Sequence, residues 1–190
     1  MSQAILRTRR IHLVALSDDH REHQVELDAD PEVMRYLGGA RSRERAQEEH
    51  REFLAEAVRG LGYWAGSVEG VFVGYWILWP PEPDGQESPE GRAELGYRLL
   101  RRYWRQGLGS EGSRELVRHG FEDLGLARIF AMTAAANIAS RATMAAAGLR
   151  YVRTFQADPG DWPPGTDLRA VEYAITREQW DLHLRPTTCM

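Results

Sequence analysis

The chain has 190 residues and a formal net charge of −4 at pH 7, with 43% hydrophobic and 27% charged residues. This length suits a single domain with a sizeable core, and the composition excludes an intrinsically disordered chain. The acidic balance argues against nucleic-acid partners, and no apolar run approaches the length that spans a membrane. We therefore expect one globular domain over residues 1–190 that binds neither nucleic acid nor a membrane.

The cysteine and histidine residues bear on the cellular compartment of the protein and on whether it binds a metal. Cys189 is the one cysteine, so no internal disulfide can form, and the first sixteen residues lack the apolar segment of a signal peptide. Both features predict a cytoplasmic protein. The six histidines are scattered without metal-ligand spacing, so we expect no metal.

The first third of the chain alternates strand and helix signals. Residues 4–16 alternate apolar and polar side chains and predict a first strand. Ser17 is a typical N-cap, and the acids that follow it predict a helix to about Asp28. Residues 42–60 predict a charged amphipathic helix whose inward residues are Phe53, Leu54 and Val58.

The middle of the chain predicts strands. Residues 61–79 divide at Glu69-Gly70 into two segments rich in valine and aromatic residues, the pattern of a hairpin. Residues 80–92 are rich in proline and acids and predict a loop. Residues 93–100 alternate again, which directs Tyr97 to one face and Glu94 to the other.

The C-terminal half predicts two strand–helix pairs and two closing strands. Apolar residues recur at helical spacing from Leu108 until Gly125, and residues 127–133 are a short apolar run typical of a buried strand. Residues 137–148 predict an alanine-rich helix. Strands follow at 150–155, where we expect Tyr151 in the core, and at 168–176. The order of elements predicts a mixed α/β (α+β) domain.

A glycine-rich turn lies directly before the helix that starts at Leu108, in "YWRQGLGSEGSRELVRHGF" (residues 103–121). The first amides of a helix lack internal partners, and the helix dipole adds partial positive charge there. Glycines at 107 and 109 would let an anion approach the backbone, although they also suit a simple strand-to-helix turn. The amides that would cradle a phosphate are those of Arg105, Gln106, Gly107, Leu108, Gly109 and Ser110.

This turn resembles the pyrophosphate loop Q/R-x-x-G-x-G/A of the GNAT acetyltransferases, with Trp104 in the first slot. The variant YW-x-x-G-x-G/A is similar to the RimJ/RimL branch, which acetylates N-terminal amines of ribosomal proteins and includes relatives with other acceptors. Further segments resemble that branch in the expected order over nearly the whole chain: 30–39, 94–100, 121–133, 137–152 and 171–180. The resemblance implies a twisted, mostly antiparallel sheet of about six to seven strands flanked by about four helices.

The resemblance also implies acetyl-CoA as co-substrate and an amine as acceptor. It places a backbone amide near Leu99 or Leu100 opposite the thioester carbonyl, where it would stabilise developing negative charge. Glu94 matches the position of the family's general base and would act through water; a solvated charge at the strand edge is the alternative. A carboxylate base suits an N-terminal amine, about a tenth of which is already free at pH 7.

Asn137 and Ser140 match the family's N-x-x-S motif at the head of the second conserved helix. The resemblance implies that Asn137 binds the pantetheine arm or its neighbouring backbone and that Ser140 lies near the sulfur; helix capping is the alternative for both. Many family members carry an acid tyrosine four residues beyond this serine, but Met144 occupies that slot here.

Positive charge and aromatic residues complete the candidate site. Arg101 and Arg105 lie in a basic stretch that suits an anionic co-substrate, and Gln106 flanks the cradle. Aromatic residues could line an acceptor pocket, although at strand spacing they are more often core; they are Tyr36, Tyr63, Trp64, Trp76 and Trp79.

We expect an acetyl-CoA-dependent N-acetyltransferase that transfers the acetyl group directly in a ternary complex to a protein N-terminus or a small-molecule amine. Acids in the 80–92 loop hint at a cationic acceptor. One alternative is a non-catalytic acyl-CoA-binding regulatory module with the same fold, and another is a nucleotide-binding protein. The sequence leaves open whether the chain is a monomer or a homodimer.

Overall fold

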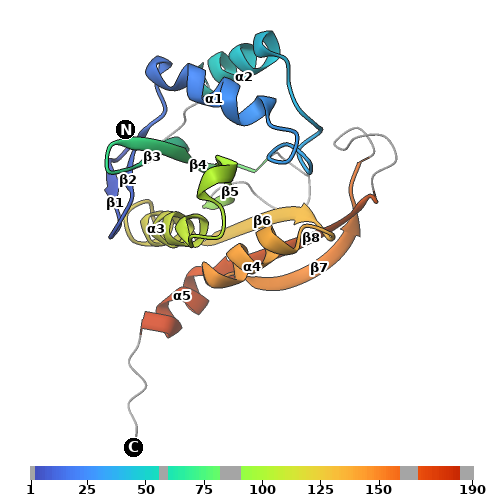
Figure 1. The fold of residues 1–190 in the computed structure, drawn as a ribbon. Helices are drawn as coiled ribbons and strands as arrows, with labels where there is room; N and C mark the ends of the chain where they lie inside the picture. The colour runs from blue at the N-terminus through green and yellow to red at the C-terminus, as the bar shows by residue number, and fades with distance from the viewer. Residues whose placement is uncertain (1–2, 56–59, 82–90, 159–166, 185–190) are drawn as a thin grey trace, which may run out of the picture.

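The computed structural model describes residues 3–55, 60–81, 91–158 and 167–184 (Figure 1). In these ranges the strands are β1 (Leu6–Arg7), β2 (His12–Ala15), β3 (Gly62–Val68), β4 (Val71–Trp79), β5 (Arg92–Leu99), β6 (Arg128–Ala134), β7 (Arg150–Gln156) and β8 (Arg169–Thr176). The helices are α1 (Arg21–Ala29), α2 (Arg43–Ala55), α3 (Leu108–Glu122), α4 (Ile138–Ala146) and α5 (Arg177–Leu184), with short 3₁₀ turns η1 (Asp18–His20) and η2 (Arg101–Tyr103).

The described strands form one mixed sheet in the order β1-β2-β3-β4-β5-β6-β8-β7. Every neighbouring pair is antiparallel except β5 and β6, which run parallel. The mixed α/β class and the mostly antiparallel sheet are therefore confirmed. The described residues hold eight strands and five α-helices, slightly more than we expected from the sequence.

Helices cover both faces of the sheet (Figure 1), with α1 and α2 on one face and α3 and α4 on the other. Each face has its own apolar core because side chains alternate along the strands. Trp64 and Trp76 are fully buried in the larger core, which packs against α3. Tyr63 and Tyr75, their neighbours in the sequence, point to the opposite face and pack near α1.

The two halves of the sheet separate between β5 and β6. Their parallel pairing covers three residue pairs, from Arg92↔Arg128 to Glu94↔Phe130. In contrast, β4 stays paired with β5 to Leu99, and β8 stays paired with β6 to Ala134. Beyond Glu94 the two parallel strands diverge, and the opening between them is where the candidate site lies.

Two local expectations are wrong, and one holds in part. Residues 4–16 form the β1–β2 hairpin instead of one strand, because the Thr8 amide bonds to the Ile11 carbonyl at 2.9 Å and closes a tight turn. On α2, Phe53 and Leu54 are half-buried, with the ring of Phe53 stacked on Tyr63, but the fully buried residues are Ala46 and His50, and Val58 lies outside the described residues. Tyr151 is 54% exposed because β7 is the edge strand of the sheet, and its ring contacts that of Tyr173 on the neighbouring strand at 5.8 Å between centroids.

Candidate active site

A cavity of about 1020 Å³ occupies the opening between β5 and β6 and extends to the start of α3 and one side of α4. Side chains from both diverging strands line it, including Glu94 and Tyr97 from β5 and Thr133 from β6. The predicted site residues that line it are Glu94, Leu99, Arg105, Gly107, Leu108, Gly109, Ser110, Asn137 and Ser140.

The start of α3 forms one end of this cavity. Gly107 is the N-cap and has φ 77°, a left-handed conformation that a residue with a Cβ adopts only at a cost. The first internal hydrogen bond of the helix runs from the Glu111 amide to the Gly107 carbonyl at 3.0 Å. The amides of residues 108–110 therefore precede the internal hydrogen-bond ladder, as the anion cradle requires.

Packing against the sheet fixes the position of this helix start. A Cβ on Gly112 would lie 2.5 Å from Nε1 of Trp76, so glycine is what lets α3 approach β4 closely. The same indole nitrogen donates to the Gly109 carbonyl at 3.1 Å. From the other side, the Glu111 carboxylate accepts from Thr8 Oγ1 at 2.6 Å and from the backbone amide of Arg10 at 2.9 Å, which ties α3 to the β1–β2 turn.

The ladder of β5 distinguishes between the two predicted oxyanion donors. The Leu100 amide bonds to the Val73 carbonyl at 3.0 Å and is therefore occupied. Successive residues of a strand direct their backbone groups to opposite edges, so the amide of Leu99 faces away from β4, toward the opening. Its carbonyl, on the same edge, accepts from Trp104 Nε1 at 2.8 Å, which confirms this orientation.

Tyr97 and Ser140 form a hydroxyl pair across the cavity. Tyr97 Oη donates to Ser140 Oγ at 3.1 Å, which leaves the serine proton available to a further acceptor. Burial raises the pKa of Tyr97, so its hydroxyl stays protonated near neutral pH. The sequence motifs did not point to Tyr97, whose partner is 43 residues away; the one signal was its place on the inner face of the strand with Leu99.

Asn137 caps α4. Its Oδ1 accepts from the Ser140 amide at 3.1 Å, and its Nδ2 donates to Thr133 Oγ1 at 3.1 Å. The capping alternative is therefore realised in the structure, and the same cap fixes Ser140 at the cavity wall.

Three predicted residues lie outside the cavity wall. Leu100 is buried in the smaller core near α1. Arg101 is exposed and pairs with Asp30 at 3.3 Å. The side chain of Gln106 donates to the Arg102 carbonyl at 3.0 Å. Arg105 is the one of the two predicted arginines that lines the cavity.

The aromatic residues separate according to the face of the sheet. Tyr36, Tyr63 and Trp79 line the cavity, with the rings of Tyr63 and Trp79 5.5 Å apart. Trp64 and Trp76 belong to the core on the opposite face, so for these two residues the core alternative holds. Most of the acidic loop at 80–92 lies outside the described residues.

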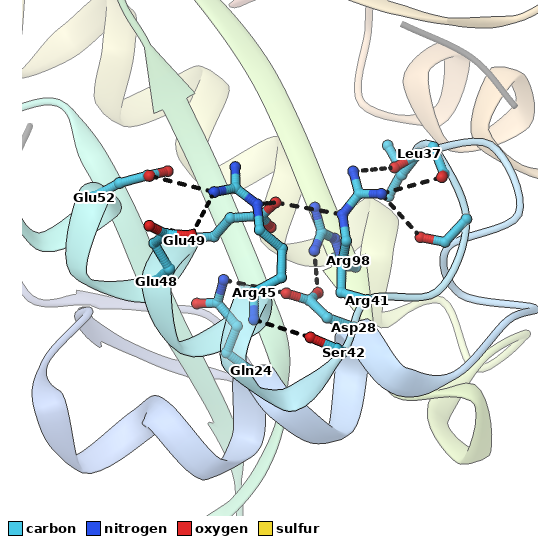
Figure 2. A network of polar contacts seen from close by, with 12 residues as sticks. Gln24, Asp28, Leu37, Arg41, Ser42, Arg45, Glu48, Glu49, Glu52 and Arg98 are labelled. Carbon is cyan, nitrogen blue, oxygen red and sulfur yellow. Dashed lines mark hydrogen bonds and ion pairs between the residues drawn. The ribbon is translucent and has the colours of Figure 1, made fainter.

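An ion-pair network that includes a buried pair forms the α1 side of the site (Figure 2). The Arg98 guanidinium donates to Asp28, which is fully buried and also accepts from Gln24 Nε2 at 3.3 Å. Burial raises the pKa of Asp28, against the attraction of Arg98. Arg98 lines both the large cavity and a second one of about 410 Å³ beside it.

The described residues lack two further features, a metal-binding cluster and a membrane-spanning helix. In the described ranges no three His, Cys, Asp or Glu side chains gather closely enough to hold a metal ion. None of the described helices is both long and apolar enough to cross a bilayer.

Comparison with known proteins identifies relatives of this arrangement. Residues 10–150 match the family model described as "Acetyltransferase (GNAT) domain". A protein of Aspergillus fumigatus named FsC-acetyl coenzyme A-N(2)-transacetylase is 42% identical over 185 residues, which cover 94% of this chain and 79% of that protein.

Solved structures share the fold at lower sequence identity. A GNAT-family acetyltransferase from Bacillus anthracis superposes with a TM-score of 0.78 at 20% identity, covering 92% of this chain and 99% of that one. RimL, a ribosomal L7/L12 alpha-N-protein acetyltransferase solved with coenzyme A, gives a TM-score of 0.74 at 19% identity, covering 90% and 97% of the two chains.

Proposed function

The chain belongs to the GNAT acetyltransferase family, and we propose that it transfers the acetyl group of acetyl-CoA to a primary amine on a small molecule in a ternary complex. One observation carries the proposal: the cavity between β5 and β6 joins the free amides at the start of α3 to Glu94 and the Tyr97–Ser140 pair. The diphosphate of acetyl-CoA would lie at the α3 end of this cavity, and its thioester would lie further along, beside Glu94 and the Tyr97–Ser140 pair.

The residues of the cavity fit coenzyme A. The left-handed Gly107 and the amides of residues 108–110 form a cradle for the diphosphate, and Arg105 adds positive charge beside it. Acetyl-CoA supplies the acyl group as an activated thioester. The outward amide of Leu99 stabilises the negative charge that develops on the carbonyl oxygen.

The protons move through groups on both faces of β5. The amine nitrogen forms a bond to the carbonyl carbon while the carbon–sulfur bond breaks and its electron pair stays on sulfur. Glu94, through a water, accepts the proton that the amine loses. Ser140 gives a proton to the sulfur and takes one back from solvent. Tyr97 keeps its own proton and stabilises the Ser140 oxygen through their hydrogen bond, in the place of the tyrosine that Met144 replaces.

A small-molecule acceptor is favoured over a protein N-terminus by the relative from Aspergillus fumigatus. Its name describes acetylation at an N2 nitrogen of a compound designated FsC, and it is 42% identical to this chain. The aromatic rings of Tyr36, Tyr63 and Trp79 give the acceptor side of the cavity apolar walls suited to a small organic molecule. The YW-x-x-G-x-G motif supports a place in the RimJ/RimL-like branch.

The test is release of coenzyme A thiol from acetyl-CoA with a panel of small amines. We expect turnover, and Glu94→Gln should lower kcat at least tenfold at neutral pH while the affinity for coenzyme A is kept. Glu32→Gln is a matched control, because Glu32 lines the same cavity at its exposed rim. Tight binding of coenzyme A without turnover of any amine would instead identify a regulatory acyl-CoA-binding module.

A further inference from the structure

Arg98 is a charged residue at the acceptor side of the cavity that the transfer chemistry does not use. Alternation along β5 places it on the same face as Glu94 and opposite Tyr97. Its side chain is 13% exposed and lies at the junction of the large cavity and the 410 Å³ cavity. Arg98 and Glu94 therefore line the same side of the large cavity.

The neighbouring charges in Figure 2 are matched with one another. The terminal nitrogens of Arg41 donate to the carbonyl oxygens of residues 37–39, and its Nε pairs with Glu49 at 3.3 Å. Glu49 also accepts a hydrogen bond from Arg45 Nε at 2.9 Å. These groups hold α2 to the segment after α1 and have little capacity left for a ligand.

Arg98 differs because most of its donors are not engaged. A guanidinium has five N–H groups, and within the described parts of the chain only Nη1 makes a hydrogen bond, to Asp28. The guanidinium carbon lies over the ring of Tyr75, 5.4 Å from the ring centroid. The ion pair and the ring fix the group, so its remaining edge is presented to the cavities in a defined orientation.

We propose that this edge of Arg98 binds an acyl oxygen of the acceptor, which belongs to a carboxylate or to an amide carbonyl. The substrates are then amines derived from amino acids. The inference rests on the proposed function. A fixed guanidinium favours an oxygen acceptor and repels an alkylammonium, which disfavours simple cationic amines. The second cavity, walled by Met34, Met132 and Phe155, continues beyond Arg98 and has room for the rest of a larger acceptor.

Matched triplets of amines test this proposal. Each triplet contains a free amino acid, its amide and the amine that lacks the acyl group, for example L-leucine, L-leucinamide and isopentylamine. We expect kcat/KM for the two acyl-bearing members to exceed that for the third by about tenfold or more, since a charge-assisted hydrogen bond is lost with the acyl oxygen.

Two variants show whether Arg98 is responsible. In Asp28→Asn/Arg98→Gln both charges are removed together, so no unpaired buried charge remains. We expect KM to rise about tenfold for the acyl-bearing amines and much less for isopentylamine, so that the preference within each triplet is lost, while the affinity for coenzyme A is kept. Arg98→Lys keeps the ion pair but loses the planar fork, and should raise KM for the same two members if the double variant does not fold.

The outcomes separate the two proposals. Equal use of all three members by the unmodified protein, or an equal loss across a triplet in both variants, overturns the role of Arg98 and leaves the acetyltransferase function standing. No thiol release with any triplet overturns both proposals.

Discussion

Replacing Gly112 by alanine should destabilise the protein, whereas the same change at Gly109, one turn earlier on α3, should not. A Cβ at position 112 would lie 2.5 Å from Nε1 of the buried Trp76 ring, and that ring also donates to the Gly109 carbonyl at 3.1 Å. The indole therefore cannot move aside without losing its hydrogen bond. At position 109 the nearest heavy atom to a new Cβ is Leu99 Cδ1 at 3.4 Å, which is ordinary contact.

The magnitudes follow from these contacts. Overpacking costs about 1 to 3 kcal/mol and the lost hydrogen bond about 1 kcal/mol, while alanine regains up to about 1 kcal/mol of helix propensity. The net loss for Gly112→Ala is about 1 to 3 kcal/mol, or roughly 3 to 10 °C in Tm for a chain of this size. For Gly109→Ala we expect no loss, because only the propensity gain applies.

Thermal and urea unfolding of the two variants, with and without coenzyme A, checks this reasoning. Because the clash displaces the helix start, Gly112→Ala should also bind coenzyme A more weakly. If it is as stable as the unmodified protein, or if Gly109→Ala is the less stable of the two, the packing of α3 on Trp76 does not set the position of the cradle.

Three further changes test other contacts. Tyr97→Phe should lower kcat tenfold or more with little change in coenzyme A affinity. Because burial raises the pKa of Tyr97, its ionisation should cause no loss of rate between pH 7 and 9 in the unmodified protein. Rates with a low-pKa amine measure both effects. Glu111→Gln should reduce the free energy of unfolding by about 1 to 2 kcal/mol in urea titrations, since its carboxylate accepts from Thr8 and Arg10. Hydrogen bonds from Arg118 and His119 lower the pKa of Asp123 in the folded protein. Ionised Asp123 therefore stabilises the fold above the pKa that it has in the unfolded chain, and this stabilisation is lost as the pH falls below about 4. Asp123→Asn should show a smaller acid-induced drop in Tm than the unmodified protein.

Local patterns were enough to predict the elements that carry the site. The turn at Glu69-Gly70 joins β3 to β4, and α3 begins at Leu108, because these boundaries depend on the conformations of a few adjacent residues. The positions of the cradle glycines follow directly from the start of α3, and that of Ser140 follows from the start of α4 at Ile138.

Contacts distant in sequence were not predictable in the same way. The pairing of Tyr97 with Ser140 and of Arg98 with Asp28 depends on how α4 and α1 pack on opposite faces of β5. The same limit explains why the sequence leaves open whether Trp64 and Trp76 line the acceptor pocket or belong to the core. Period-two alternation separates them from Tyr63, but it does not show which face of the sheet holds the acceptor.

The position of β5 in the sheet explains how one strand would serve both substrates of the proposed reaction. Until Glu94 it is paired on both edges, and beyond that residue β6 diverges, so backbone amides such as that of Leu99 face the opening instead of a neighbouring strand. Side-chain alternation then sends Glu94 and Arg98 to the α1 face and Tyr97 to the α4 face. A register slip of one residue would exchange these sets. The hydrophobic pattern that fixes the register of β5 against β4 therefore also fixes which side of the cavity would receive the amine in the proposed reaction.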